Sequence, residues 1–357
     1  MNIPDIRNAN LEQKRVLARV DFNVEFSSRG EPKEKYRIGA VKKTIDFILS
    51  KKGIKLALLS HLGRPGGKDK IYSFEPAVGA ISKILGRRLV FAEDCAGDKV
   101  KEKLGKLEAG EILMLENVRF HKEEVENSGD FAEKLAENFD IYVNEAFSVT
   151  HRAQASIAKI VEFLPSFAGI NFLEEIIALS NIRRGLEGPA VAIIGGIKIE
   201  TKLPVINFFA ENYDQILLGG RIGLEAENRK LNFPANVILP KDYLEQGFDI
   251  GPLAIKQFSE FIKNAKTIVW NGPLGQFERE EFFVGTKEIV KAIVKNKAAY
   301  KVAGGGETIQ VLEKLDLIKN FDFVSTGGGA MLEFLAKGTL PALKALENQK
   351  LNLKSQK

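Results

Sequence analysis

The stretch "KLALLSHLGRPGG" (55–67) joins a run of apolar residues to a histidine, an arginine and a turn rich in glycine and proline. Continuous runs of Val, Ile and Leu are typical of strands buried on both faces, as in parallel sheets covered by helices. Such runs recur in "RVLARV" (15–20), "EILMLE" (111–116), "DIYVNEAF" (140–147), "AVAIIGG" (190–196), "QILLGG" (215–220), "NVILP" (236–240), "TIVWNGP" (267–273), "AYKVAGGG" (299–306) and "DFVSTGGG" (322–329). Each run therefore predicts a buried strand that ends in a turn.

Amphipathic segments that fit helices lie between the strands, at 75–88, 130–139 and 308–320. Strand and helix alternate twice over, which predicts an α/β protein with two doubly wound, Rossmann-like domains built on parallel sheets. With 357 residues, the chain is long enough for two domains. We expect one domain at 1–169, a helical hinge at 170–187, a second domain at 188–345 and a C-terminal tail at 346–357.

The composition is that of a soluble globular protein, with 45% hydrophobic and 28% charged residues. No run approaches the roughly 18 apolar residues of a membrane span, and the first residues lack the features of a secretory signal. The single cysteine, Cys95, forbids an internal disulfide, which fits the cytoplasm, and we expect it to be an ordinary, partly buried small residue and not a reactive thiol. The net charge of +5 is slight and no basic block is interleaved with aromatic residues, so we expect no nucleic-acid partner.

The strand ends of the first half carry basic and polar residues. In open α/β sheets, ligands bind beyond the carboxyl ends of the strands. The residues there are Asp21 and Asn23, His61 and Arg64, Arg119 and His121, and His151 and Arg152. Each of the three histidines has an arginine within three residues. A guanidinium group matches phosphate or carboxylate oxygens and an imidazole adds a further donor, so these residues predict a concave basic site for a small polyanion.

Two other interpretations of these pairs are open. Any single pair could cap a helix or form a surface salt bridge. Metal binding is the second alternative, but no two histidines show the spacing of helical ligands, and none stands with a cysteine in the sequence. An adjacent cation would also oppose a metal ion. The anion site is therefore favoured.

The strand ends of the second half are rich in glycine, at 195–196, 219–220, 304–306 and 327–329. Glycine lets the backbone approach a ligand closely, and a glycine turn that leads into a helix offers N–H groups to phosphate. Tight connections need glycine too, and neither the P-loop pattern nor G-x-G-x-x-G is present. Lys198 and Lys202 would suit phosphates, and Glu307 beside Thr308 would suit magnesium. This half is interpreted as a nucleotide domain.

In this order the motifs resemble the phosphoglycerate kinase family. The resemblance rests on "KRVLARVDFNV" (14–24), "SHLGRP" (60–65), "LENVRFHKEE" (115–124), "YVNEAF" (142–147), "THRAQAS" (150–156), "AIIGG" (192–196), "FDIGP" (248–252), "TIVWNGPLGQFE" (267–278), "GGGET" (304–308) and "STGGGAMLEFL" (325–335). It covers nearly the whole chain. It implies reversible phosphoryl transfer between 1,3-bisphosphoglycerate and Mg-ADP, giving 3-phosphoglycerate and Mg-ATP, in glycolysis or gluconeogenesis. Family members are mostly monomers.

The resemblance also implies roles for individual residues. The triose-acid site would comprise Asp21, Asn23, Arg37, His61, Arg64, Arg119 and Arg152. The nucleotide site would comprise Gly196, Lys198, Lys202, Gly219, Asn271, Pro273, Glu278, Gly306, Glu307 and Thr308, with Glu307 meeting the magnesium ion. Arg37, Lys198 and the glycine turn at Gly328 would act on the moving phosphoryl group, in direct in-line transfer after domain closure and without a phospho-enzyme.

The sequence departs from the family pattern at several places. Glu307 and Thr201 stand where the family usually has aspartate, and "NEAF" (144–147) replaces the usual "NDAF". After "LLGG" (217–220) the chain continues with Arg221 and lacks a helix and strand pair that normally help wall the adenine pocket. Base specificity is therefore open. A non-catalytic binding protein that retained the fold is the alternative to an enzyme, and the intact set of basic residues favours the enzyme.

Overall fold

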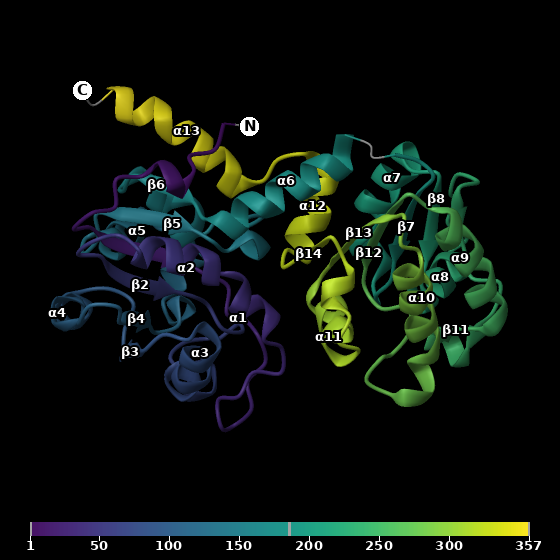
Figure 1. Cartoon of the computed structure of the whole chain (residues 1–357), viewed down its shortest axis with the longest axis horizontal. Coiled ribbons are helices and arrows are strands. Elements are labelled where there is room, and N and C mark those ends of the chain that lie inside the picture. The colour runs from purple at the N-terminus through teal and green to yellow at the C-terminus, as the bar shows by residue number, and fades with distance from the viewer. Residues whose placement is uncertain (1, 185–186, 356–357) are drawn as a thin grey trace. The chain divides into compact units, whose positions relative to one another are not determined.

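A computed structural model describes residues 2–184 and 187–355, with side chains up to residue 349. The chain divides into two compact units, of which the first comprises Met1–Ile176 and Thr339–Lys357 and the second Ile177–Gly338. Figure 1 shows one sheet with its helices in each unit. Among the described residues, no helix combines the length and the apolar character needed to cross a membrane.

The first unit is built on a six-stranded parallel sheet with the strand order β3-β4-β2-β1-β5-β6. Its strands are β1 (Arg15–Arg19), β2 (Lys55–Leu59), β3 (Leu89–Ala92), β4 (Ile112–Leu115), β5 (Ile141–Asn144) and β6 (Ser166–Ala168). Its helices are α1 (Tyr36–Ala40), α2 (Lys42–Leu49), α3 (Val78–Leu85), α4 (Asp98–Lys106), α5 (Gly129–Ala136), the first part of α6 (Ile170–Arg184) and α13 (Pro341–Ser355). The strand order changes direction between β1 and β5, which is where open sheets bind ligands.

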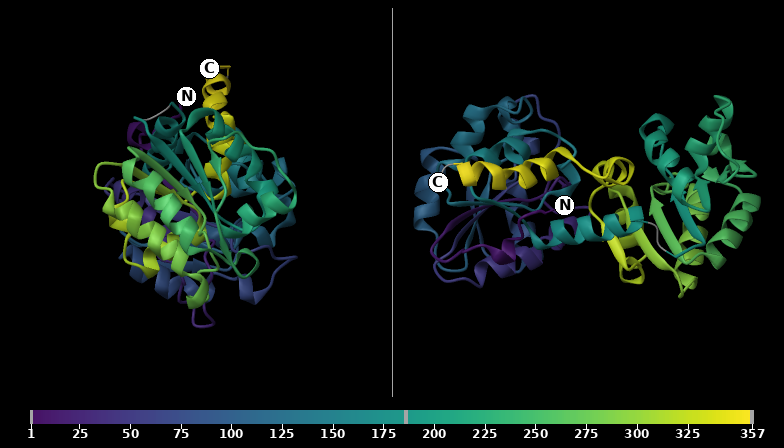
Figure 2. Two further views of the ribbon diagram at one scale, coloured as in Figure 1. Left: turned by 90° about the vertical axis from the view of Figure 1, so that its right-hand side faces the viewer. Right: turned by 90° about the horizontal axis from the view of Figure 1, so that it is seen from above.

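The second unit repeats this architecture, with a six-stranded parallel sheet in the order β14-β13-β12-β7-β8-β9. Its strands are β7 (Ala190–Ile194), β8 (Gln215–Leu218), β9 (Val237–Ile238), β12 (Thr267–Asn271), β13 (Tyr300–Gly304) and β14 (Phe323–Ser325), and a separate antiparallel pair joins β10 (Tyr243–Leu244) to β11 (Asp249–Ile250). Its helices are α7 (Leu203–Asn212), α8 (Gly220–Asn228), α9 (Pro252–Asn264), α10 (Val284–Lys295), α11 (Gly306–Lys314) and α12 (Gly329–Lys337). Figure 2 shows helices on both sides of this sheet.

Local sequence sets the ends of these helices. Pro252 occupies the first turn of α9, where its missing N–H costs nothing. Helices α3 and α12 end at Gly86 and Gly338, which take the left-handed conformation with φ of 66° and 76°. The strands between them are buried on both faces, and every residue of β7 and β12 is buried. The predicted fold class, two doubly wound α/β domains with parallel sheets, is confirmed.

The division of the chain differs from the sequence-based boundaries. The two units meet within α6, after Ile176, and not at either end of the segment 170–187. Residues 339–357 belong to the first unit, although the sequence assigns residues up to 345 to the second domain and the rest to a tail. Helix α13 runs to Ser355 and buries Leu343 and Leu346, and Glu347 Oε1 accepts a hydrogen bond from the Asn2 N–H at 3.0 Å. Figure 2 shows α13, in yellow, lying along the first unit.

Candidate functional site

Asp21 organises the polar residues that follow β1. Ser148 Oγ donates a hydrogen bond to Asp21 Oδ2, and Asp21 Oδ1 accepts from the Asn23 N–H at 3.0 Å. Arg37 Nη1 lies 3.5 Å from Asp21 Oδ2 and donates to the Asn23 carbonyl at 2.9 Å. Burial would raise the pKa of Asp21, but the charge of Arg37, the neighbouring His61 and the Ser148 hydrogen bond hold that pKa well below its usual value. Asp21 is therefore an ion that holds Arg37.

Glu34 fixes Arg37 from its other side. Its carboxylate accepts the Arg37 N–H at 2.5 Å and lies 3.7 Å from Arg37 Nε. Glu34 is buried and the side chain of Arg37 is only 13% exposed. Because two carboxylates share one guanidinium, Arg37 is held in a single place.

His61 is buried and its donor pattern is set by its neighbours. Arg19 Nη2 lies 3.3 Å from His61 Nδ1, and Asp21 Oδ1 lies 3.8 Å from the same atom. Burial lowers the pKa of His61 well below its usual value, and Arg19, Arg119 and Arg152 lower it further against the opposing charge of Asp21. The ring is therefore neutral at pH 7. Since arginine only donates, Nδ1 accepts and Nε2 carries the proton.

A cavity of about 1050 Å³ in the same unit is lined by Arg64, Arg119 and Arg152, whereas Asp21, Arg37 and His61 are not among its lining residues. Arg119 is 7% exposed and donates from Nη1 to the Gly63 carbonyl at 2.7 Å, while its Nε and Nη2 are buried without a hydrogen-bond partner. Burial, with the charges of Arg19 and Arg152, lowers the pKa of Arg119 to about 10. Buried donors without partners are costly, and an anion that accepted hydrogen bonds from them would offset this cost.

The residues predicted for the triose-acid site therefore lie in one unit and near one another. Asn23 contributes by position, because its Oδ1 accepts the Gly63 N–H at 2.8 Å and so holds the loop that carries Arg64. Asp21 acts electrostatically on Arg119 and Arg152. Arg64 itself is exposed.

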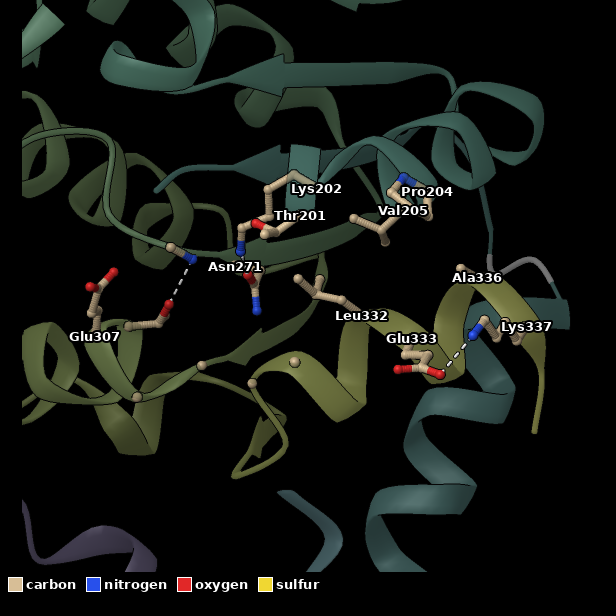
Figure 3. Close-up of a pocket in the computed structure, with 16 residues that line it drawn as sticks. Thr201, Lys202, Pro204, Val205, Asn271, Glu307, Leu332, Glu333, Ala336 and Lys337 are labelled. Carbon is tan, nitrogen blue, oxygen red and sulfur yellow. Dashed lines mark hydrogen bonds and ion pairs between the residues drawn. The ribbon is translucent and has the colours of Figure 1, made fainter. Parts of the chain in front are cut away.

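A second cavity, of about 410 Å³, lies in the second unit at the ends of β7, β12, β13 and β14 (Figure 3). Lys202 Nζ donates to Asn271 Oδ1 at 2.7 Å, and Asn271 Nδ2 donates to the Gly304 carbonyl at 2.7 Å. Burial lowers the pKa of Lys202 to about 8, although the carboxylate of Glu307 opposes the shift. An ammonium group at this edge of the sheet, where the strand order reverses, suits an anionic ligand.

Glycine turns form the wall of this cavity opposite Lys202. Gly305 and Gly328 have positive φ, of 105° and 45°, and a Cβ at Gly328 would lie 3.9 Å from Gly305 Cα. Gly306 begins α11 and Gly329 begins α12, so the N-terminal N–H groups of two helices border one cavity. This arrangement suits phosphate.

An adjoining cavity of about 420 Å³ is lined by Gly196, Pro273 and Glu278 among the predicted residues. Glu307 lines both cavities. Loss of hydration raises the pKa of Glu307, Glu278 raises it further and Lys202 lowers it. Arg221 and Phe248 complete the wall, with the Arg221 guanidinium 5.9 Å from the Phe248 ring centroid and Arg221 Nη1 donating to the Gln246 carbonyl at 3.3 Å. The two cavities together can hold a flat base and a chain of phosphates.

Three predicted nucleotide residues have other positions or partners. Lys198 is exposed and precedes a 3₁₀ turn at Ile199–Thr201, so it shares no helix face with Lys202 and lines neither cavity. Gly219 is buried, where a Cβ would lie 3.1 Å from Gly195 Cα. Thr308 Oγ1 accepts the Gly272 N–H at 2.8 Å, which makes Thr308 a brace for the β12 turn as well as a lining residue.

The sequence analysis missed several residues at these sites. Arg19 lies within an apolar strand pattern and Ser148 carries no motif of its own, so only the fold brings them to His61 and Asp21. Glu34 stands three residues before Arg37 but also carries no motif. No histidine stands with a cysteine in the sequence, but the fold brings one of them to Cys95. His121 lies beside Asp94 and Cys95, because β3 and β4 are neighbouring strands.

Comparison with known proteins gives consistent matches. A model of the family described as "Phosphoglycerate kinase" matches residues 6–225 and 224–338. The phosphoglycerate kinase of Leptospira biflexa is 37% identical over 393 residues, covering 97% of this chain and 98% of the relative. That of Wolbachia pipientis is 35% identical over 398 residues, covering 98% of this chain and 100% of the relative.

Two solved structures match over almost their full length. The phosphoglycerate kinase of Pyrococcus horikoshii has a TM-score of 0.87 and 29% identity, and covers 98% of this chain and 100% of its own. The enzyme of Coxiella burnetii has a TM-score of 0.77 and 31% identity, with 97% and 99% covered. The two parts of the family match meet at residues 224–225, inside the segment where the sequence indicates a deletion. The chain belongs to the phosphoglycerate kinase family.

Proposed function

We propose that this chain is an active phosphoglycerate kinase, which transfers a phosphoryl group reversibly between 1,3-bisphosphoglycerate and Mg-ADP to give 3-phosphoglycerate and Mg-ATP. The observation that carries the proposal is the basic cavity in which buried Arg119 leaves two nitrogens without partners. A chain that bound no anion there would have no reason to retain that cost. The enzyme acts as a monomer in the cytoplasm, where a single cysteine is suited to a reducing compartment.

The triose acid binds in the basic cavity of the first unit. Arg64, Arg119 and Arg152 bind its carboxylate and phosphate oxygens, because each offers a planar fork of donors. His61 adds the Nε2–H as a neutral donor. Asp21 and Asn23 act indirectly on the substrate, because they hold Arg37 and the loop at Gly63 in place.

The nucleotide binds across the two cavities of the second unit. Its phosphates lie against Lys202, Gly306 and the start of α12, and Glu278 reaches the ribose. The base lies near Pro273, in the space that Arg221 and Phe248 border. Glycine at 196 and 219 keeps the β7 and β8 turns close to this ligand.

Magnesium fits the residues present. It binds proteins through one or two carboxylates and takes its other ligands from substrate phosphates and water. Glu307 supplies one carboxylate at the border of both cavities. When bound, the ion neutralises charge on the nucleotide phosphates.

Transfer is direct and in line, with catalysis by positioning and by charge on the moving phosphoryl group. Arg37 from the first unit, Lys198 from the second and the α12 N-terminus at Gly328 provide this charge. Domain closure brings the substrates together and excludes the water that would otherwise accept the phosphoryl group.

The test is an assay of the purified chain with 3-phosphoglycerate and Mg-ATP, coupled to NADH oxidation. We expect activity in the wild type and a loss of about 10³–10⁵-fold in turnover for Arg37→Ala, with binding of 3-phosphoglycerate retained. Arg29→Ala, which removes an exposed arginine, is the matched control. Parallel wells with GTP measure the base preference of the pocket that contains Arg221.

The opposite results discriminate between the candidates. Normal turnover in Arg37→Ala would remove that residue from the mechanism. A folded wild type that binds 3-phosphoglycerate but turns over neither nucleotide would favour the non-catalytic binding protein.

A further inference from the structure

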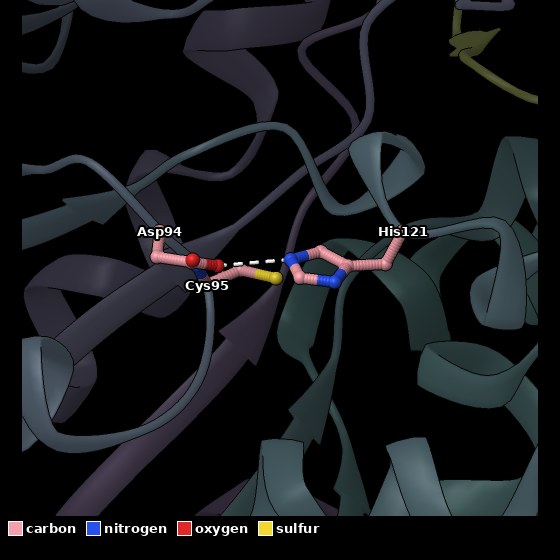
Figure 4. Close-up of side chains that lie close together, drawn as sticks. All are labelled: Asp94, Cys95 and His121. Carbon is pink, nitrogen blue, oxygen red and sulfur yellow. Dashed lines mark hydrogen bonds and ion pairs between the residues drawn. The ribbon is translucent and has the colours of Figure 1, made fainter. Parts of the chain in front are cut away.

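Asp94, Cys95 and His121 form a side-chain cluster to which the proposed kinase activity assigns no role. Asp94 and Cys95 follow β3, and His121 follows β4 after one short 3₁₀ turn. The two strands are paired in parallel, with Ala92 opposite Leu115, so their carboxyl ends meet. Figure 4 shows the three side chains pointing toward one another. One ligand atom from each lies within 4.8 Å of the other two.

His121 and Asp94 are held in place by hydrogen bonds and ring stacking, and both remain partly exposed to solvent. His121 Nε2 lies 2.9 Å from Asp94 Oδ1, which also accepts the Cys95 N–H at 2.7 Å. The imidazole stacks on Phe131 with ring centroids 4.9 Å apart. The side chains of His121 and Asp94 are 34% and 37% exposed, so an ion can reach the cluster from solvent.

The third member, Cys95, is buried without a partner. Cys95 is only 1% exposed, and its Sγ forms no hydrogen bond with any residue that the structure describes. Burial raises the pKa of the Cys95 thiol well above its usual value, and the negative charges of Asp94, Glu124 and Glu116 raise it further. One ligand atom of Asp94 and one of His121 lie within 4.8 Å of this sulfur.

We propose that Asp94, Cys95 and His121 bind a divalent transition-metal ion of the zinc class through one carboxylate, one thiolate and one imidazole. A fourth position stays open to water. Thiolate and imidazole are zinc ligands, whereas magnesium and calcium require oxygen. The thiolate and the carboxylate balance the charge of the ion. As the metal–sulfur bond forms, the S–H bond breaks and its proton passes to solvent.

The spacing requires little movement. Ligand atoms in a tetrahedral zinc site, at metal distances of about 2.0–2.3 Å, lie roughly 3.3–3.6 Å apart. The His121–Asp94 separation of 2.9 Å would open slightly, and the other separations, at most 4.8 Å, would close. Two cations stand near His121 in the sequence. Arg119 donates to the Gly63 carbonyl at 2.7 Å, and Lys122 is exposed.

The test is titration of the full-length, metal-free protein with Co²⁺, followed by absorption spectroscopy. Because the chain has one cysteine, any thiolate-to-cobalt charge-transfer band must come from Cys95. We expect this band together with the intense visible bands of a tetrahedral centre, saturation at one ion per chain, and bleaching by Zn²⁺. Substrates are absent, so the result is independent of kinase activity.

Variants separate the cluster from incidental binding. Cys95→Ser should abolish the charge-transfer band. Asp94→Asn and His121→Gln should each weaken Co²⁺ binding by at least about tenfold, since even outer contacts of a metal site are worth 10–100-fold. His151→Gln, a histidine outside the cluster, is the matched control and should change nothing. Circular dichroism checks that each variant is folded.

Two outcomes would overturn the proposal. One is a folded wild type that shows no charge-transfer band at saturating Co²⁺. The other is a band that persists unchanged in both Asp94→Asn and His121→Gln, because the thiolate would then bind metal without the cluster. These two variants change partly exposed side chains, so they decide the question even if Cys95→Ser does not fold.

Discussion

Arg19 determines which nitrogen of the His61 ring can donate a hydrogen bond. Arg19 is fully buried and donates from Nε to Ser156 Oγ at 2.8 Å and from Nη1 to the Val20 carbonyl at 2.5 Å. Its remaining nitrogen points at His61 Nδ1, at 3.3 Å. A cation fixed in that place keeps the ring neutral and directs the Nε2 proton away from Arg19. In the proposed anion site, His61 is thus a neutral donor among arginines.

This arrangement predicts different results for two amide substitutions at His61. The glutamine amide can place its nitrogen near the position of Nε2, whereas the shorter asparagine amide reaches only the position of Nδ1. We expect His61→Gln to keep most of the affinity for 3-phosphoglycerate. We expect His61→Asn to lose about 10–100-fold, the value of a hydrogen bond to a charged group. KM for 3-phosphoglycerate measures both, and equal losses would show that Nε2 is not the donor.

Lys202 predicts a pH dependence on the nucleotide side. Its pKa of about 8 lies below the usual value because the group is buried, so the free enzyme loses this charge above pH 8. Phosphates bind the charged form, and KM for Mg-ATP should therefore rise about tenfold from pH 7 to pH 9. Lys202→Arg stays charged over that range and should show a flat profile. The same rise in both proteins would assign the titration to another group.

Prediction from sequence works at this scale where residues follow strands. Asp21, His61, Arg119, Lys202 and Asn271 lie where the ends of buried runs indicate, because side chains after parallel strands share one edge of a sheet. Arg19 could not be found, since a buried arginine inside an apolar run has no pattern of its own. The roles of the predicted site residues remain proposals.

At the scale of elements, Glu145 links the end of β5 to the start of α6. Its carboxylate accepts hydrogen bonds from the N–H groups of Asn171 and Phe172, at 3.0 and 3.3 Å, and from Thr44 Oγ1 at 2.8 Å. These groups satisfy the first turn of α6. Gly169 allows this approach, because a Cβ there would lie 1.7 Å from Glu145 Oε2. The glutamate of "NEAF" therefore reaches the first turn of α6 because residue 169 has no side chain.

Glu145 predicts a loss of stability as pH rises. Burial raises its pKa to about 8, against the hydrogen bonds that lower it. Between pH 4.5 and 8 the folded state binds one more proton than the unfolded state, so the free energy of unfolding falls as pH rises through this range. The contribution is on the order of 5 kcal/mol. Urea unfolding at about pH 5 and pH 8.5 should show a smaller difference in Glu145→Gln than in the wild type.

The matched control for this measurement is Glu133→Gln, which changes an exposed glutamate of α5. It should keep the wild-type difference between the two pH values. If Glu145→Gln also keeps that difference, the group that titrates lies elsewhere.

The elements that the sequence missed are short. Strand β6 has three residues, and β10 and β11 have two each. Strand β3 was missed because it begins at Leu89, directly after the predicted helix 75–88, with no glycine or proline to separate them. The helix in fact ends earlier, at Gly86. Strands β9 and β14 are equally short, with two and three residues, but each lies in a longer apolar run that the sequence shows. Where no such run surrounds it, a strand of this length has no recognisable periodicity.

At the scale of the molecule, the chain builds two parallel sheets and then returns to the first unit. Local pattern predicts the two sheets, since each strand and helix carries its own signal. It does not predict that α13 packs on the first unit, because that choice depends on Ala146, Val149 and Ile157, which form a buried cluster with Ala342. Long-range packing of this kind has no local signature.

The proposal as a whole requires that a phosphoryl group moves from a nucleotide in one unit to a carboxylate held by the other. Its most direct test is to incubate the chain with 3-phosphoglycerate and Mg-ATP in the presence of hydroxylamine, which traps an acyl phosphate as a hydroxamate. We predict a hydroxamate that requires both substrates and disappears in Arg37→Ala. A folded protein that binds each substrate in separate titrations and forms no hydroxamate would contradict the account.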